Sequence, residues 1–353
     1  GLLRLAVPEI CGGGAMPPVD FDRSSGWEKV MRAIVQDTYG SAEVLRLGEI
    51  ERPEVGDDEV LVRVHAAGLD RGVWHMMTGL PLMIRIMGFG LRGPKVRVPG
   101  YDFAGRVAAV GKNAKRCEIG EEVFGSGSGS FAEYICARED RLEPKPTNLS
   151  LEQAAAVPTS ALTALQGLRD HGKIEAGQKV LIVGASGGVG TFAVQLAKAF
   201  GAEVTGVCRT AKVDRVRSIG ADHVIDYKQD DFVQQGERYD LILDIGGNRA
   251  LCQLRRVLTP GGTLVIIGGE EGGRWVGGMD RWLRALLASP FVSHNLRAFV
   301  AKSNKADLQL LKELIEAGKV RPVIDRTFPL NEAPDALRYL EEGRARGKVV
   351  IVV

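Results

Sequence analysis

The chain has 353 residues, of which 45% are hydrophobic and 25% are charged, with a formal net charge of +2. This composition is typical of a globular protein, and it excludes a largely disordered chain or a polytopic membrane protein. The small net charge provides no global attraction to nucleic acid or to a membrane surface, so we expect neither as a partner. The length predicts about two domains.

The five cysteines form no CxxC pair, and their number is odd. We therefore expect neither a disulfide framework nor a structural zinc cluster, and a reducing, cytoplasmic location. Residues 1–30 contain a Gly-Gly-Gly run and two adjacent prolines, and they lack the apolar core of a signal peptide. We expect this segment to be a disordered extension, with Met31 at the start of the ordered protein.

Short β-rich runs separated by glycine turns follow, up to Pro146. Alternating apolar and polar residues, as in Glu59–Ala67, indicate half-buried strands, and several such runs favour a barrel or a sandwich. The predicted strands are Met31–Gln36, Glu59–Ala67, Arg106–Val110, Glu122–Gly125 and Phe131–Ala137.

The middle of the chain alternates strands with helices, which predicts a doubly wound parallel sheet. We expect the tail to return to the first domain, so that 156–320 is inserted between 31–155 and 321–353. The predicted strands are Lys179–Val183, Glu203–Val207, His223–Tyr227, Asp240–Ile245, Thr263–Ile267 and Leu296–Ala301, and in the tail Lys348–Val353. The predicted helices are Val189–Phe200, Ala211–Ile219, Arg249–Leu258 and Lys305–Ala317, and in the tail Asn331–Glu342.

A glycine-rich turn, Gly184–Gly190 (GASGGVG), joins the first of these strands to its helix. The spacing is that of the dinucleotide fingerprint, with alanine in place of the first glycine. The helix N-terminus would offer free N–H groups to the pyrophosphate of a dinucleotide. The expected contacts are Ala185, Ser186, Gly187, Gly188, Val189 and Gly190.

The end of the second strand bears on the choice of coenzyme. An NAD site usually has a carboxylate there, but this strand ends at Cys208 and is followed by Arg209 and Lys212. A guanidinium at that edge can pair with a 2′-phosphate. We therefore predict NADPH as the coenzyme. The alternative is that Arg209 and Lys212 contact only solvent, as the basic start of the next helix.

Taken together, these segments resemble the medium-chain dehydrogenase/reductase superfamily, and within it the zinc-free quinone oxidoreductase branch. The resemblance implies a GroES-like β-barrel catalytic domain, an inserted Rossmann domain and a homodimer along the Rossmann sheet edge. It rests on AAGLDRGVWHMMTG (66–79), VPGYDFAGRVAAVG (98–111), GEEVFG (120–125), GSFAEY (129–134), AAAVPTSALTALQGL (154–168), VLIVGASGGVG (180–190) and GADHVIDY (220–227).

Zinc enzymes of this superfamily have metal ligands at three places that in this chain hold Asp70, Tyr101 and Thr159. An aspartate, a tyrosine and a threonine do not form a zinc site, so we expect no metal, and no flavin. The chemistry left is hydride transfer from NADPH to an already polarised acceptor, such as a quinone or an α,β-unsaturated carbonyl.

The expected catalytic residues, which would face the acceptor, are Asp70, His75 and Tyr101. Each could instead have only a structural role. Asp70 could anchor a loop through its carboxylate, His75 could be a structural histidine whose hydrogen bonds are all made within the fold, and Tyr101 could be a packed aromatic ring. The resemblance implies further cofactor contacts at Thr163, Tyr227, Gly246, Gly268, Gly269 and Lys348.

The apolar, cationic segment Leu80–Val98 is longer than expected for this connection. We interpret it as a flap over an apolar acceptor, with Trp74 lining the pocket; the alternative is an excursion packed on the barrel.

Two other functions stay open. One is an alcohol or aldehyde dehydrogenase, which the missing zinc ligands disfavour. The other is an NADPH-binding sensor or structural protein with little turnover.

Overall fold

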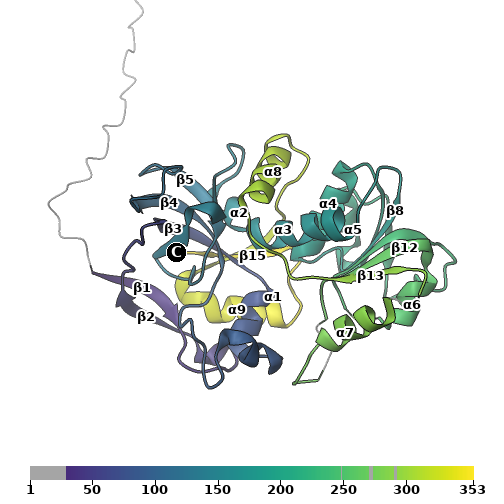
Figure 1. Ribbon diagram of the computed structural model, residues 1–353, viewed down its shortest axis with the longest axis horizontal. Helices are drawn as coiled ribbons and strands as arrows, with labels where there is room; N and C mark the ends of the chain where they lie inside the picture. Colours follow the sequence, from purple (N-terminus) through teal and green to yellow (C-terminus); the bar gives the residue numbers. More distant parts are fainter. Residues whose placement is uncertain (1–28, 248, 270–272, 290–291) are drawn as a thin grey trace, which may run out of the picture.

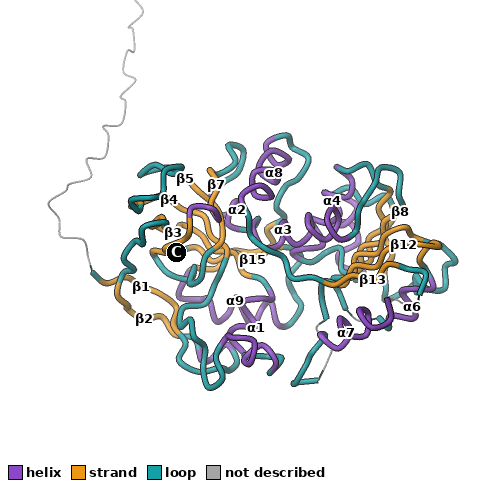
Figure 2. The backbone as a smooth tube through the Cα atoms, in the orientation of Figure 1, coloured by secondary structure: helices purple, strands orange, loops and turns teal. Residues whose placement is uncertain are grey.

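The computed structural model describes residues 29–247, 249–269, 273–289 and 292–353. Its strands form a mostly antiparallel sheet, a parallel sheet and a separate two-stranded ribbon. Figure 1 shows the antiparallel strands at the left and the parallel strands at the right, with α3 between them. The same arrangement appears in Figure 2, where the strands gather into two groups.

The first sheet contains both early and late parts of the chain, in the order β14-β15-β3-β4-β5-β7, with β6 also paired to β3. Within it β15 runs antiparallel to β3, so that Val349 lies opposite Leu69. The tail therefore returns to the first sheet, as expected. Its strands are β3 (Glu59–Leu69), β4 (Asp102–Val110), β5 (Glu122–Ser126), β6 (Tyr134–Arg138), β7 (Leu142–Pro144), β14 (Ile324–Pro329) and β15 (Lys348–Val352).

The parallel sheet has the order β10-β9-β8-β11-β12-β13. The chain starts in its middle and winds outward in both directions, which is the doubly wound topology predicted from the sequence. Its strands are β8 (Lys179–Val183), β9 (Glu203–Cys208), β10 (His223–Asp226), β11 (Tyr239–Asp244), β12 (Leu258–Ile266) and β13 (Asn295–Ala298).

Strand β8 shows why this sheet is buried on both faces. Its side chains alternate between two cores: Val180 and Ile182 pack with α4 on one face, and Leu181 and Val183 pack on the other. A continuous apolar run is what a central parallel strand requires. Helices cover both faces, as Figure 1 shows for α4 and α5 and for α6 and α7.

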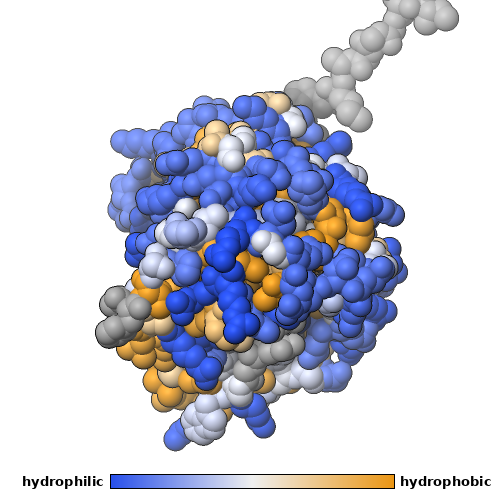
Figure 3. Space-filling view, turned by 90° about the vertical axis from the view of Figure 1, so that its right-hand side faces the viewer, coloured by the Kyte–Doolittle hydropathy of each residue, from blue (hydrophilic) through white to orange (hydrophobic). Residues whose placement is uncertain are grey.

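Among the described residues, the helices α4, α5, α6, α8 and α9 were expected, whereas α1, α2, α3 and α7 were not. The helices are α1 (Arg71–Thr78), α2 (Leu151–Ala155), α3 (Pro158–Gln166), α4 (Gly188–Ala199), α5 (Val213–Ser218), α6 (Leu251–Arg256), α7 (Met279–Ala288), α8 (Lys305–Glu316) and α9 (Ala333–Glu341). Low on the face shown in Figure 3, where Figure 1 places α7, apolar side chains gather at the surface.

Several predicted boundaries differ from the structure. The ribbon strands are β1 (Val30–Val35) and β2 (Arg46–Glu51), so ordered structure begins before Met31, and residues 1–28 of the expected extension lie outside the described residues. The strand expected from Phe131 begins only at Tyr134. Residues 131–133 instead bridge to β1, where the N–H of Ile34 donates to the Phe131 carbonyl and Ala33 pairs with Ala132.

Candidate functional site

The glycine-rich turn Gly184–Gly190, the phosphate loop, lies between β8 and α4, as the spacing predicted. Gly187 is the N-cap of α4, and Gly190 packs so closely that a Cβ there would lie 2.1 Å from the Gly184 oxygen. The N–H groups of Gly184 and Ala185 donate to the carbonyl of Val207 on β9, which fixes the turn. The first turn of α4 therefore presents its N-terminus at the carboxyl edge of the sheet, where anions bind.

Glycines also end β11 and β12 at this edge. A Cβ on Gly268 would lie 1.9 Å from the Ile245 oxygen, and the N–H of Gly246 donates to the Val183 carbonyl beside the phosphate loop. Gly269 lies against Gly278 in the same way. At these predicted cofactor positions two backbone segments pack against each other. That close packing alone explains why the residues are glycines.

Lys348, the first residue of β15, points at the phosphate loop. It is only 1% exposed, and its ammonium donates to Ser160 Oγ at 3.0 Å. A Cβ on Gly188 would lie 3.1 Å from Lys348 Cδ and 3.3 Å from Ser160 Oγ. Within the described residues this buried ammonium has no ion-pair partner within 4 Å; its charge interacts with the Asp102 carboxyl from a greater distance and is available to an anion at the loop.

Asp102 lies behind this lysine. Its carboxylate accepts from the N–H of Thr159 at 3.0 Å and from Thr159 Oγ1 at 2.6 Å, so it caps the start of α3. Complete burial raises the pKa of the Asp102 carboxyl to about 7; the positive charge of Lys348 opposes this rise and the like charge of Asp70 adds to it. One turn further along α3, Thr163 Oγ1 donates to the Thr159 carbonyl at 2.7 Å.

Asp70 and His75 both belong to α1 and its cap. Asp70 Oδ1 accepts from the N–H of Val73 at 3.2 Å, whereas Oδ2 is buried and has no hydrogen-bond partner among the residues that the structure describes. His75 Nδ1 lies 2.7 Å from the Leu80 carbonyl, which can only accept, so Nδ1 carries the hydrogen. A neutral His75 then carries no hydrogen on Nε2 and cannot donate to a developing oxyanion from that atom.

Tyr101 is the remaining predicted catalytic residue. It is partly exposed, and its backbone carbonyl accepts from the N–H of Gly127 at 2.9 Å. Its phenol is a hydrogen-bond donor, whereas an ionised Asp70 can only accept. Of the three predicted residues, Tyr101 is therefore the one whose neutral side chain can donate to an oxyanion.

The two cations predicted to recognise a 2′-phosphate differ in their surroundings. Arg209 is exposed directly after β9, and its Nε donates to the Tyr227 hydroxyl at 3.3 Å. Lys212 instead donates to the Ala345 carbonyl at 2.5 Å, and burial lowers its pKa. The structure brings Arg209 and Tyr227 together at the sheet edge, while the ammonium of Lys212 already has a backbone partner.

The residues at the three zinc-ligand places do not fit a zinc ion. Asp70 Oδ1 caps a helix, and the Thr159 hydroxyl donates its hydrogen to Asp102. In the part of the chain that the structure describes, no three histidine, cysteine or acidic side chains group so as to hold a metal. A zinc site requires several thiolate, imidazole or carboxylate ligands that converge on one point.

The predicted flap, Leu80–Val98, is anchored by its backbone. The N–H of Leu82 donates to the Arg274 carbonyl at 2.8 Å, and the hydroxyl of Tyr39 lies 2.9 Å from the carbonyl oxygens of both Phe89 and Gly90, which share its one hydrogen. The side chains at its tip are exposed in this structure. Trp74 lies beside His75, with ring centroids 5.0 Å apart, and its Nε1 is buried with no hydrogen-bond partner in the described part of the chain.

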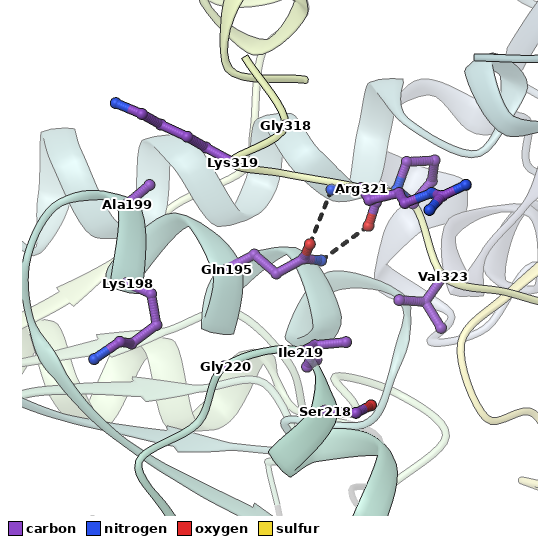
Figure 4. A pocket seen from close by; sticks show the side chains of 11 residues that line it. Gln195, Lys198, Ala199, Ser218, Ile219, Gly220, Gly318, Lys319, Arg321 and Val323 are labelled. Carbon is purple, nitrogen blue, oxygen red and sulfur yellow. Dashed lines mark hydrogen bonds between the residues drawn. The ribbon is translucent and has the colours of Figure 1, made fainter. Parts of the chain in front are cut away.

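A surface hollow of about 650 Å³ lies elsewhere, against the second half of α4. Figure 4 shows Gln195 at its centre, joined to the backbone of Arg321 by two hydrogen bonds of 2.9 Å. The phosphate loop is at the opposite end of α4, so this hollow is not part of the predicted cofactor site.

Asp102 and Ser160 were missed as functional candidates. Both stand beside residues that were singled out, Tyr101 and Thr159, but nothing in the local pattern shows that they face the phosphate loop. The signal that was present is an acidic residue directly before the apolar residues Phe103 and Ala104 of β4, since a fully buried carboxylate needs a partner.

Comparisons with known proteins agree with this fold. The family model described as "Alcohol dehydrogenase GroES-like domain" matches residues 56–147, and the one described as "Zinc-binding dehydrogenase" matches 219–351. A "2-methylene-furan-3-one reductase" from Solanum lycopersicum is 35% identical, over 91% of this chain and 79% of the relative. An "NADPH-dependent alkenal/one oxidoreductase, chloroplastic" from Arabidopsis thaliana is 34% identical, over 96% and 83%.

A solved structure, the quinone oxidoreductase from Coxiella burnetii, superposes with a TM-score of 0.81 at 30% identity and covers 92% of this chain and 100% of its own. The chain belongs to the medium-chain dehydrogenase/reductase superfamily, in its zinc-free quinone oxidoreductase-like branch. The two sheets are accordingly a GroES-like unit and a Rossmann-like unit. The strand pairings described do not close the first sheet into the predicted barrel.

Proposed function

We propose that this protein is an NADPH-dependent reductase of quinones or α,β-unsaturated carbonyls that works without zinc or flavin. The observation that carries the proposal is the buried ammonium of Lys348, held at the first turn of α4 with Ser160 as its hydrogen-bond partner. A buried cation beside a helix N-terminus is a site for an anion, as the diphosphate of a dinucleotide provides.

The residues of the chain divide into two groups around that anion. Gly187, Gly188 and Lys348 would hold the diphosphate, and Arg209 with Tyr227 would contact a 2′-phosphate at the sheet edge. NADPH, when bound, supplies a hydride. The relative from Arabidopsis thaliana supports this coenzyme, because it is named as an NADPH-dependent oxidoreductase.

On the acceptor side, hydride addition leaves negative charge on a carbonyl oxygen, and a positioned donor lowers the barrier. Tyr101 supplies that donor, because its phenol carries a hydrogen while the carboxylate of Asp70 and the Nε2 of neutral His75 do not. No zinc ion is needed for an acceptor that is already conjugated, in agreement with the donor set at Asp70, Tyr101 and Thr159.

The test is NADPH oxidation measured with a panel of quinones and enones, against oxidation of simple alcohols with NADP⁺. We expect turnover with the conjugated acceptors and none with the alcohols. Turnover of alcohols that depends on added zinc would instead identify an alcohol dehydrogenase. Tight NADPH binding with no turnover across the panel would identify a binding protein.

We also propose a homodimer formed along β13. This strand is the last of the parallel sheet, so its outer edge has no partner strand among the described residues. Light scattering of the purified chain tests this.

No helix in the described ranges is long and apolar enough to cross a membrane. We also propose a cytoplasmic location.

A further inference from the structure

The segment between α1 and β4 has an unusual distribution of polar and apolar groups. Its polar contacts are made on the inside: Arg85 donates to the carbonyls of Gly79 and Thr78, and its guanidinium lies 4.3 Å from the ring centroid of Tyr39. Its apolar side chains point outward. The exposed ones are Ile86 (68%), Met87, Phe89, Leu91 (70%) and Val96.

This exposure is held in place by the backbone. The hydroxyl of Tyr39 shares its one hydrogen between two carbonyls of the tip, and the N–H of Lys95 donates to the Phe89 carbonyl at 3.0 Å. Soluble monomers rarely expose several neighbouring apolar side chains, and patches of this kind mark interaction sites. None of the five packs into the hydrophobic cores of the described chain.

A tryptophan lies at the base of the segment. Trp275 is 71% exposed, and its carbonyl accepts from the N–H of Met83 at 3.0 Å. Figure 1 shows the loop before α7 close to the segment that follows α1. Tryptophan is the side chain that favours the boundary between water and lipid, because its ring is apolar and its N–H is polar.

Within the segment between α1 and β4 the charge has one sign, whereas Glu270 and Glu271 precede Trp275 in the sequence. Residues 71–101 contain five lysines and arginines and no aspartate or glutamate, although the whole chain is nearly neutral. Arg97 pairs with Asp37, but Arg92 and Lys95 are exposed and form no ion pair within the described residues. Apolar side chains flanked by unpaired cations are complementary to an anionic lipid surface, which offers negative headgroups above an apolar interior.

We propose that the tip of this segment, Ile86–Val96 together with Trp275, docks on anionic lipid membranes. The apolar side chains enter the headgroup region, and Arg92 and Lys95 contact the lipid phosphates. The sequence predicted no membrane partner because the near-zero net charge averages this region with acidic parts elsewhere. Docking of this kind needs no membrane-spanning helix.

The test is sedimentation of the purified full-length chain with vesicles of phosphatidylcholine alone and with vesicles that also contain phosphatidylglycerol. We expect binding to the anionic vesicles, weaker binding at high salt, and little binding to the neutral ones. Arg92→Gln with Lys95→Gln, and separately Ile86→Ser with Leu91→Ser, should each lower the partition coefficient about tenfold. Thermal unfolding shows whether each variant is folded.

The matched control is Leu287→Ser, which removes a leucine of α7 that is 72% exposed, and it should leave binding unchanged. A second readout is quenching of tryptophan fluorescence by brominated lipid, which Trp275→Phe should abolish. Equal binding to neutral vesicles, an equal loss in Leu287→Ser, or no binding by the wild type would overturn the proposal. Dissociation of a dimer by Ile86→Ser with Leu91→Ser, without any wild-type vesicle binding, would assign the surface to a second copy of the chain.

Discussion

Lys348 Nζ lies 3.0 Å from Ser160 Oγ, although the two residues are 188 positions apart in the chain. The contact joins β15, at the returning tail, to the first turn of α3, and both residues border Gly188 at the start of α4. The first sheet thus contributes a buried cation to a phosphate loop that belongs to the second sheet. A cofactor bound there would be held by both parts of the molecule.

Replacing Lys348 tests this arrangement. Lys348→Met keeps the length of the side chain and removes its charge, so KM should rise about tenfold or more for NADPH and for NADH alike. Both coenzymes should be affected because both carry the diphosphate. Ser160→Ala, which removes only the hydrogen-bond partner, should have a smaller effect. An unchanged KM in Lys348→Met would place the diphosphate elsewhere.

Arg209 should distinguish the two coenzymes. Arg209→Ala should raise KM for NADPH about ten- to a hundredfold, the effect of losing a charge-assisted hydrogen bond, and leave KM for NADH nearly unchanged. The effect should decrease as salt rises, because Arg209 is exposed. Lys212→Ala is the matched control and should have a smaller effect, since that ammonium donates to Ala345. Equal weakening of both coenzymes by Arg209→Ala would contradict a role in reading the 2′-phosphate.

The parallel sheet was predictable because its signals are local. The run Lys179–Val183 coincides with β8, and a glycine-rich turn followed by a helix gives the phosphate loop its own signature. The contacts around Asp102 were not predictable in this way. Asp102 and Thr159 are 57 residues apart, and only the pairing of β15 with β3 brings Lys348 to the same place.

Helix α7 was missed for a related reason. Its apolar residues Leu283, Leu286 and Leu287 face solvent, whereas Arg281 is buried and donates to Asp244 at 2.6 Å. The buried face of α7 combines this ion pair with Ala285 and Trp282, so a pattern that expects apolar residues inside and charged residues outside does not mark the helix clearly.

Asp102 should make stability depend on pH. Its pKa is about 7 in the folded chain and lies near the ordinary value of 3.8 when unfolded, so between these values the folded state keeps a proton that the unfolded state has lost. The contribution of this group to the free energy of unfolding should therefore be largest at low pH and fall as pH rises toward 7.

Urea unfolding of the wild type and of Asp102→Asn checks this at about pH 5 and about pH 8. The variant, which cannot ionise at this position, should show a smaller decrease between the two pH values. Thr159→Val is the comparison, because it keeps the carboxyl group and removes one of its hydrogen bonds. A variant with the same pH dependence as the wild type would show that Asp102 does not titrate in this range.

Metal removal should have no effect on activity. The Thr159 hydroxyl donates to Asp102 and Asp70 Oδ1 caps α1, so the zinc-ligand places are engaged in other contacts. Quinone reduction should persist after prolonged treatment with a chelator, and elemental analysis should find far less than one zinc per chain. Activity that disappears with zinc and returns when zinc is added back would refute this.

The donor to the acceptor oxygen should be Tyr101. Tyr101→Phe removes only the hydroxyl, so kcat for quinones and enones should fall about tenfold or more, while KM for NADPH stays nearly constant because the diphosphate site is built by other residues. His75 is the informative comparison, since its Nδ1 hydrogen is used by the Leu80 carbonyl. His75→Ala should change thermal stability as well as kcat, because that bond links α1 to the segment that follows it. If Tyr101→Phe retains full kcat with every acceptor while His75→Ala loses it, the donor is a protonated His75, and Tyr101 is a packing residue.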